Sequence, residues 1–320
     1  YTLEKEVGRG SYGVVFEGRI AKTGQRVAIK RLPCRNPECI ELYLQELWAM
    51  RATAKNHVNV IALHSCLLQT GPRTLRPLTP GKLPIQLVES VMKGTEDQPA
   101  PPRCSALWLV MEYCDGGDLN QYLLSRPPDA GRNQAVVQQL CSALAFLHSL
   151  GIIHRDLKPD NVLVCVTAKG PVVKVADFGL SKMSEGVAEG NLTRQRFSST
   201  CGSDFYMAPE VWGGLTYTAQ ADIFSLGVLF WAVLERITFV EEGTAQEQLG
   251  AYVWKGRSGW LTPLGEALWE NAQLQLSIPV KFKRAPPLPP PPGPATCALL
   301  SDMLAADPDA RPTAEQLEAR

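Results

Sequence analysis

Residues 154–161 read HRDLKPDN, so six polar or charged side chains lie within eight positions of one another. Asp156 can accept a proton from an attacking hydroxyl or orient it, and Lys158 can stabilise developing negative charge. Asn161 offers a side-chain oxygen to a metal ion, and the ADFG stretch at 176–179 adds the carboxylate of Asp177. The loop therefore supplies a proton acceptor, a cation and part of a metal site.

A glycine-rich stretch, GRGSYGVV at 8–15, places glycines at Gly8, Gly10 and Gly13. The pattern G-x-G-x-x-G is weak evidence alone, because dinucleotide-binding proteins also carry it. In that class the motif follows a strand and opens a helix, whereas here strand-forming residues flank both sides and VAIK follows at 27–30. The pattern predicts a strand–turn–strand flap over a triphosphate. A glycine-rich hairpin without a ligand is the alternative.

Lys30, at the end of VAIK, supplies a localised cation for phosphate oxygens. Such an ammonium needs a carboxylate to hold it, and we predict Glu46 because its surroundings are more apolar than those of Glu38 and Glu41. Phosphoryl transfer depends mainly on positioning and charge neutralisation, which explains the many fixed charges at 154–161. No P-loop G-x-x-x-x-G-K-[ST] is present, so a nucleotide hydrolase of that class has little support.

The chain changes character near residues 112–118, from strand-like to helical patterns. The helix predicted over 220–236 is apolar nearly all round, so we expect it to be buried in the larger lobe. Two proline-rich stretches interrupt the pattern, and the middle of the first (83–92) could form a further strand. The predicted elements are strands at 14–20, 25–32, 60–69 and 106–114, helices at 38–54, 133–150 and 220–236, and proline-rich inserts at about 71–103 and 285–294.

Composition argues against several functional classes. The 32 Lys+Arg residues balance the 32 Asp+Glu residues of this 320-residue chain, which removes the electrostatic case for nucleic-acid binding. No apolar run reaches the length of a membrane span. The nine cysteines include no C-x-x-C pair, which argues against a zinc site or a disulfide framework. We therefore expect neither a nucleic-acid nor a membrane partner.

With these motifs in this order, the chain resembles a eukaryotic serine/threonine protein kinase catalytic domain. The resemblance continues through CGSDFYMAPE (201–210), ADIFSLG (221–227) and DARPTAEQL (309–317). It implies an α+β, bilobal protein-kinase fold: a small antiparallel β-sheet lobe with one main helix (1–114), and a larger, mostly helical lobe (115–320) with an activation segment at 177–210. It also implies Mg²⁺-assisted transfer of phosphate from ATP to Ser or Thr hydroxyls of protein substrates. Lys158, two residues after Asp156, matches the serine/threonine pattern.

The resemblance further implies roles for individual residues. Adenine would bond to the backbone near Glu112 and Cys114, with Met111 as gatekeeper and Asp118 near the ribose. Asp222 would bind the backbone of the catalytic loop. The remaining implied positions are Gly8, Gly10, Gly13, Val15, Ala28, Lys30 and Leu163 for ATP, Asn161 and Asp177 for the metal, Glu210 and Arg311 as a buried ion pair, and Met50, Leu63, His154 and Phe178 as a hydrophobic spine.

Regulation is expected at the activation segment. Arg155 precedes Asp156, so a phosphate on the segment would meet a guanidinium there. Ser199, with arginines three and five residues before it, is the predicted acceptor; the alternative is that these arginines only solvate the loop. Ser203 stands where such kinases usually place a threonine that bonds the catalytic Asp and Lys, and a serine hydroxyl can make the same bonds. Asp118 and Asp160 favour a basic residue before the phosphoacceptor.

The stretches YCDGGDLNQYLLSR, CGSDFYMAPEVW and LERITFV resemble, more narrowly, the PDZ-LIM-protein-interacting kinase-like (Clik-type) kinases. That resemblance implies a nuclear location, with the cytoplasm as a second one, and a PDZ-LIM actin-associated protein as partner. Two other classes stay open. One is a pseudokinase-like scaffold, which the presence of Lys30, Glu46, Asp156, Asn161 and Asp177 disfavours. The other is an ATP-binding interaction protein with slow chemistry.

Overall fold

The computed structural model describes residues 1–10, 13–33, 57–71, 74–78, 106–176, 203–215, 218–240, 247–255, 260–276 and 292–319. The described residues fall into two compact units, one ending at Cys114 and the other beginning at Asp115. Within the described ranges, no helix is both long and apolar enough to cross a lipid bilayer.

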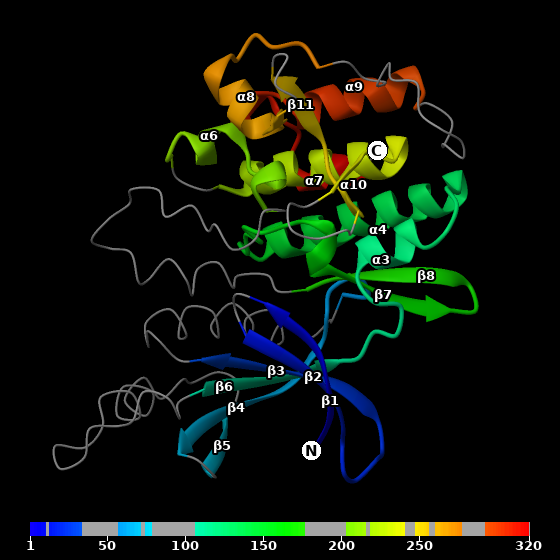
Figure 1. The fold of residues 1–320 in the computed structure, drawn as a ribbon, viewed down its shortest axis with the longest axis vertical. Coiled ribbons are helices and arrows are strands. Elements are labelled where there is room, and N and C mark those ends of the chain that lie inside the picture. Colours follow the sequence, from blue (N-terminus) through cyan, green and yellow to red (C-terminus); the bar gives the residue numbers. More distant parts are fainter. Residues whose placement is uncertain are drawn as a thin grey trace, which may run out of the picture. The chain divides into compact units, whose positions relative to one another are not determined.

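The N-terminal unit is built on one antiparallel sheet of six strands in the order β1-β2-β3-β6-β4-β5 (Figure 1). Its innermost strands are rich in Val, Ile and Leu, as expected for strands buried on both faces, and Val27, Leu107 and Val110 are almost fully buried. The strands are β1 (Thr2–Gly10), β2 (Gly13–Arg19), β3 (Arg26–Pro33), β4 (Leu63–Gly71), β5 (Thr74–Leu78) and β6 (Ala106–Glu112).

The structure shows a strand that was not predicted at the start of the first proline-rich stretch. Residues expected to begin an insert form β5, which pairs with β4 from Gly71↔Thr74 to Cys66↔Leu78. Pro77 is tolerated there because β5 is an edge strand, where one side of the backbone needs no ladder hydrogen bond. β4 also begins three residues later than predicted and runs to Gly71. The predicted helix at 38–54 and the possible strand at 83–92 lie outside the described residues.

The C-terminal unit is mainly helical, as predicted, and α7 (Ala219–Glu235) is its central element. Every residue of α7 from Ala221 to Val233 is buried, which confirms the expected buried helix. The sequence did not predict three small sheets in this unit, β7–β8, β9–β10 and β11–β12. The other elements are α3 (Leu119–Leu124), α4 (Ala130–Ser149), β7 (Val162–Thr167), β8 (Gly170–Val175), α6 (Pro209–Trp212), β9 (Thr238–Val240), β10 (Glu247–Leu249), β11 (Tyr252–Lys255), β12 (Trp260–Pro263), α8 (Leu264–Glu270), α9 (Pro294–Met303) and α10 (Ala314–Glu318).

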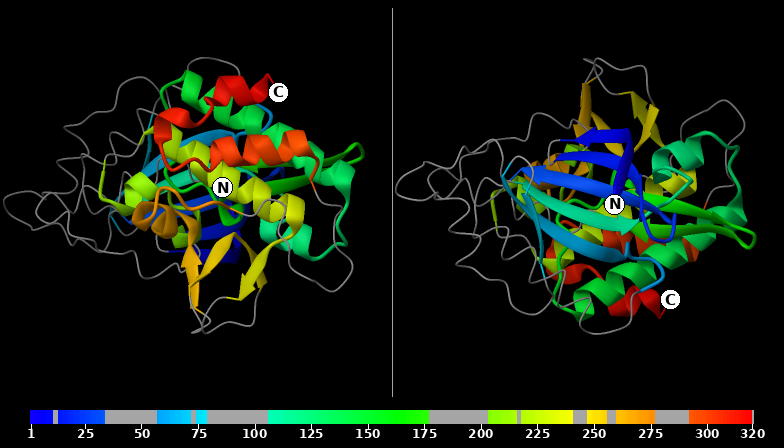
Figure 2. Two further views of the ribbon diagram at one scale, coloured as in Figure 1. Left: turned by 90° about the horizontal axis from the view of Figure 1, so that it is seen from above. Right: turned by 90° about the horizontal axis from the view of Figure 1, so that it is seen from below.

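Polar side chains fix α4 within this unit. Asp129 caps its N-terminus by accepting from the Arg132 backbone N–H at 2.9 Å. Gln139 accepts from Val173 N–H and donates to Pro171 C=O, so one side chain holds the outer edge of β8. The C-terminal helix α10 lies beside α4 (Figure 2), where Ser142 Oγ donates to Glu318 Oε1 at 3.1 Å. These contacts set the position of the β7–β8 hairpin on the helical core.

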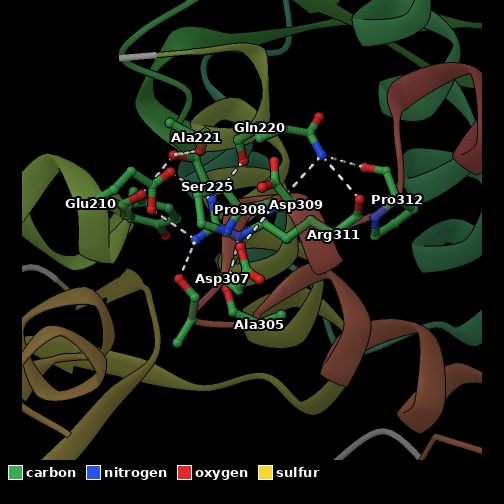
Figure 3. A network of polar contacts seen from close by, with 12 residues as sticks. Glu210, Gln220, Ala221, Ser225, Ala305, Asp307, Pro308, Asp309, Arg311 and Pro312 are labelled. Carbon is green, nitrogen blue, oxygen red and sulfur yellow. Dashed lines mark hydrogen bonds and ion pairs between the residues drawn. The ribbon is translucent and has the colours of Figure 1, made fainter. Parts of the chain in front are cut away.

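The predicted ion pair between Glu210 and Arg311 is present and buried (Figure 3). Arg311 Nη1 and Nη2 donate to the two carboxylate oxygens at 2.7 and 2.8 Å, a bidentate pairing. The same guanidinium donates to the carbonyls of Ala305 and Gln220 at 2.8 and 2.9 Å. One side chain thus joins α6, the start of α7 and the segment between α9 and α10.

Candidate active site

The loop at 154–161 brings three of the predicted residues together. Asn161 closes a short 3₁₀ turn and donates from Nδ2 to Asp156 C=O at 2.6 Å and to Asp156 Oδ2 at 3.2 Å. The Lys158 Nζ lies 4.0 Å from the same Oδ2, and Lys158 is buried. The carboxylate of Asp156 is therefore held between an amide and an ammonium. Because Asn161 donates through Nδ2, its Oδ1 is the atom it can offer to a cation.

Asp222, in the first turn of α7, binds the backbone of this loop, as predicted. It is fully buried, and its two oxygens accept from His154 N–H at 2.8 Å and from Arg155 N–H at 3.0 Å. Arg155 has a φ of 74°, a left-handed conformation that is unfavourable for a non-glycine residue, and the bond to Asp222 offsets this strain. His148 of α4 adds a third contact, with its Nε2 2.9 Å from Oδ2.

The pKa of Asp222 is lowered although burial acts to raise it. The hydrogen bond from His148 and the positive charge it carries when protonated favour the ionised carboxylate, as do His154 and the Arg155 backbone N–H. Asp222 therefore holds the loop as a carboxylate. This position is fixed by α7, the most buried helix of the unit.

His154 connects the loop to the end of β8. Its Nε2 donates to Ala176 C=O at 2.7 Å, while its Nδ1 accepts from Asp156 N–H at 3.1 Å. Ala176 N–H in turn donates to Asn161 C=O at 2.9 Å. The chain therefore leaves β8 directly beside Asn161. Asp177, the predicted second metal ligand, is the next residue and lies outside the described part of the chain.

The structure also brings together Asp118 and Leu163, which form an isolated antiparallel bridge between the start of α3 and β7. Asp118 caps α3 by accepting from Gln121 N–H at 2.9 Å. Burial raises the pKa of Asp118 to about 6, and the negative charge of Asp160 adds to that effect. Asn120, also on α3, donates from Nδ2 to Asp160 Oδ1. Asp118 and Asp160 therefore form a small acidic site beside the loop.

In the N-terminal unit, strand register places four predicted ATP-site residues on one face of the sheet. Val15 lies opposite Lys30, and Ala28 lies opposite Met111. Since side chains alternate along a strand, the side chains of all four project to the same side. Lys30 is 6% exposed. This face therefore offers a largely buried ammonium beside small and apolar side chains.

The glycine-rich stretch forms the end of a hairpin, as the sequence predicted. β1 and β2 pair up to Gly10↔Gly13, with Gly8 opposite Val15. Glu112, at the end of β6, accepts from Ala62 N–H through its Oε1 at 2.8 Å, and its own N–H donates to Ala62 C=O at 3.0 Å. Cys114, whose side chain is partly buried, is the last residue of this part of the unit.

Several predicted residues have no structural description. Glu46, Asp177 and Ser199 lie outside the described residues, as do Met50 and Phe178 of the predicted spine. Ser203 opens a short 3₁₀ turn (Ser203–Tyr206) that precedes α6. The roles of these residues stay predictions.

Two residues that support the loop were missed in the sequence. His148 contacts Asp222 across 74 positions of sequence, and Asn120 contacts Asp160 across 40. Asn120 Oδ1 also accepts from Leu249 N–H at 3.0 Å, so it links the loop to β10. A histidine in a helix and an asparagine two positions after an aspartate carry no local signal for such contacts. The residues that support the loop could therefore not be predicted from sequence spacing.

Comparison with known proteins gives one consistent result. Residues 1–320 match the family model described as "Protein kinase domain". The chain is 28% identical over 293 residues to serine/threonine-protein kinase 33 of Mus musculus (89% of this chain, 52% of that protein). It is 31% identical over 252 residues to serine/threonine-protein kinase Pkn1 of Myxococcus xanthus (77% and 30%), and 32% identical over 256 residues to serine/threonine-protein kinase ATG1c of Arabidopsis thaliana (78% and 28%). The chain spans about half the length of the first of these curated relatives and less of the other two.

Proposed function

The chain belongs to the protein kinase domain family, and from that premise we propose that it transfers the γ-phosphoryl group of ATP to serine and threonine hydroxyls of protein substrates. Relatives named serine/threonine-protein kinases support the class of acceptor. The family generally uses ATP and Mg²⁺. The observation that carries the proposal is the arrangement of Asp156, Lys158 and Asn161 on a loop held by Asp222.

Each loop residue has a defined part in this proposal. Asp156 accepts the hydroxyl proton while the substrate oxygen forms a bond to phosphorus and the bond from phosphorus to the ADP oxygen breaks. Asn161 keeps the Asp156 carboxylate oriented through two hydrogen bonds. Lys158, 4.0 Å from that carboxylate, neutralises charge on the transferring group. These residues orient the reacting hydroxyl and stabilise charge, which is what phosphoryl transfer requires.

The donor set fits a magnesium ion. Mg²⁺ prefers oxygen ligands, and Asn161 Oδ1 is available on the loop where the chain passes to Asp177. When bound, Mg²⁺ neutralises charge on the phosphate oxygens. We propose Asn161 and Asp177 as its protein ligands.

For the nucleotide, we propose the face of the N-terminal sheet that carries Lys30. Val15, Ala28 and Met111 share that face and provide apolar contact for a base. Lys30 binds phosphate oxygens and is held by Glu46. The remaining proposed contacts in the N-terminal unit are the backbone of Gly8, Gly10, Gly13, Glu112 and Cys114.

Regulation and cellular context are further proposals. Phosphorylation of Ser199 would place a phosphate within reach of Arg155, whose backbone is fixed by Asp222. The resemblance to Clik-type kinases supports a nuclear location and a PDZ-LIM actin-associated partner. Mass spectrometry of active protein tests the Ser199 proposal: full activity without phosphate between residues 193 and 203 contradicts it.

Phosphate transfer from labelled ATP to a panel of serine- and threonine-containing peptides tests the main proposal. The wild-type chain should phosphorylate at least one peptide, and Asp156→Ala should reduce turnover about 10³-fold or more, because it removes the proton acceptor. Both proteins should have the same unfolding temperature within a degree or two. If ATP and Mg²⁺ raise the unfolding temperature but no peptide is phosphorylated, the chain is a nucleotide-binding interaction protein.

A further inference from the structure

Three arginines gather at one place on the C-terminal unit, where α3 ends, α4 begins and α7 ends. Arg126 follows α3, Arg132 lies in the first turn of α4, and Arg236 caps the C-terminus of α7. We call Arg126, Arg132 and Arg236 the arginine cluster. It takes no part in the contacts that hold the catalytic loop.

Neutral groups hold the guanidinium groups in place. The Cζ of Arg126 lies 3.9 Å from the centre of the Tyr122 ring, and the Cζ of Arg132 lies 6.0 Å from the same centre. Arg126 Nη1 donates to Tyr122 C=O and Ser125 Oγ, both at 3.0 Å. Arg236 Nη2 donates to Arg126 C=O at 2.8 Å. An aromatic ring and backbone carbonyls therefore bring three positive charges close together.

Two of the three arginines, Arg126 and Arg132, carry a positive charge that no acidic side chain of the described residues pairs with. Burial lowers the pKa of Arg236; Glu247 acts to raise it and the charge of Arg132 to lower it further. Asp129, the nearest acid in sequence, accepts from the Arg132 backbone as the cap of α4. An anion placed among the guanidinium groups would relieve this repulsion.

Arg236 also occupies a strained backbone position. Its φ and ψ are 51° and 54°, in the left-handed region where helices usually end in glycine. A side chain there costs about 1 kcal/mol relative to glycine. Strained positions of this kind are often found where the side chain has a function. Here the side chain of Arg236 places a guanidinium next to Arg126.

The cluster lies within reach of a peptide bound at the catalytic loop. α3 connects the two sites: Asn120 near its start contacts Asp160 of the loop, and Arg126 follows its end. The six residues from Asn120 to Arg126 rise about 9 Å along the helix. An extended peptide covers about 3.3 Å per residue, so about three residues bridge this distance.

We propose that the arginine cluster binds an acidic or already phosphorylated residue of the protein substrate, several positions from the phosphoacceptor. Carboxylate and phosphate oxygens form strong charge-assisted hydrogen bonds with guanidinium groups that are already oriented. The acidic site of Asp118 and Asp160 lies at the other end of α3. A substrate with a basic residue near the phosphoacceptor and an acidic residue farther away is complementary in charge to the sites at both ends of α3. This inference rests on the proposed kinase activity.

A positional scan of one peptide substrate tests the proposal. A single glutamate or phosphoserine is placed at each position from two to eight residues before and after the acceptor, with glutamine or serine as the neutral reference. At one or two neighbouring positions the acid should lower KM about fivefold and phosphoserine more, with kcat changed less than twofold. The double variant R126Q/R132Q should lose this advantage, and R126K/R132K should recover part of it because the charge returns.

Matched controls separate charge from fold. The variant K22Q/K169Q removes two exposed lysines that are distant in sequence from the arginine cluster. It should keep the full decrease in KM that the acidic residue gives. Since Arg126 and Arg132 pack on Tyr122, Arg236→Gln is a second variant that leaves this stacking intact and should reduce the advantage. If peptides are phosphorylated but no position shows a KM advantage, or if R126Q/R132Q retains it, the cluster does not bind substrate. Absence of transfer to every peptide contradicts the kinase activity itself.

Discussion

Opposite charges and hydrogen-bond donors surround the buried charged groups near the start of α7, whereas groups of like charge lie near one another at each end of α3. Near α7, the buried Glu210–Arg311 pair and the buried Asp222 each have several hydrogen-bond partners. At α3, Asp118 lies near Asp160 at one end, and the arginine cluster gathers like charges at the other. The charged groups at the start of α7 hold backbone in place. The like charges at the ends of α3 repel one another, and a ligand of opposite charge would reduce that repulsion.

Two carboxylates show the difference directly. Burial acts to raise the pKa of both, but Asp222 accepts bonds from His148 and two backbone N–H groups, and its pKa is lowered. Asp118 has a backbone bond at its cap but faces Asp160, and its pKa is raised to about 6. Burial alone therefore does not decide the charge state; the donors and charges around each group do.

The largest effect should come from breaking the buried pair. Arg311→Met leaves Glu210 buried without its partner, and we expect a loss of about 3–5 kcal/mol in the free energy of unfolding. Urea denaturation measures it. The double variant E210Q/R311M removes both charges and should cost less than the single change. If R311M alone is nearly neutral, the buried pair does not stabilise the unit.

A second effect, smaller in stability, should appear in the loop. Asp222→Asn keeps the shape but replaces one accepting oxygen by an amide that cannot accept, at a cost of about 2–3 kcal/mol. The phosphorylation rate should fall more than 100-fold, since Arg155 would lose the bond that holds its left-handed conformation. Time courses of peptide phosphorylation, at a temperature where the variant is folded, measure this rate. Unchanged kcat would mean that Asp222 does not position the loop.

Substitution of Asp118 should raise the free energy of unfolding near neutral pH, whereas the two substitutions above lower it. Its pKa rises from 3.8 to about 6 on folding, so between these values the folded protein retains a proton that the unfolded chain has released. The free energy of unfolding of the wild type therefore falls relative to Asp118→Asn as pH rises from about 4 to 6, by up to about 3 kcal/mol when complete. Asparagine keeps the helix cap. Thermal unfolding of the wild type and of Asp118→Asn at pH 4.5 and 7.5 measures this change. If the variant differs from the wild type by the same amount at both pH values, the prediction is wrong.

The smallest effect should come from His148. His148→Leu removes one of three hydrogen-bond contacts to Asp222 while the two backbone donors remain, and we expect a loss of about 1 kcal/mol. NMR titration should also show the pKa of Asp222 moving upward, toward its ordinary value. His148→Gln, which can donate to the same oxygen, serves as the matched control and should shift that pKa less.

Much of the fold follows from local pattern. The alternation and apolar runs of residues 14–32 and 106–112 predicted β2, β3 and β6, and the continuous apolar surface of α7 predicted its burial. β5 was missed because its proline and arginine hide a strand that only pairing with β4 makes stable. The sheets β9–β10 and β11–β12 were missed because their strands, three or four residues long, are too short to show a period.

The sequence by itself determined the chemical groups of the site, since Asp156, Lys158 and Asn161 lie within six positions and one loop must bring them together. The tertiary structure decided what surrounds them. Asp222, His148, Asn120 and Arg236 reach their partners across 40 to more than 100 positions of sequence. Hydrogen bonds and charge interactions act over a few ångströms of space, and only packing of the helices fixes which distant residues meet at that range.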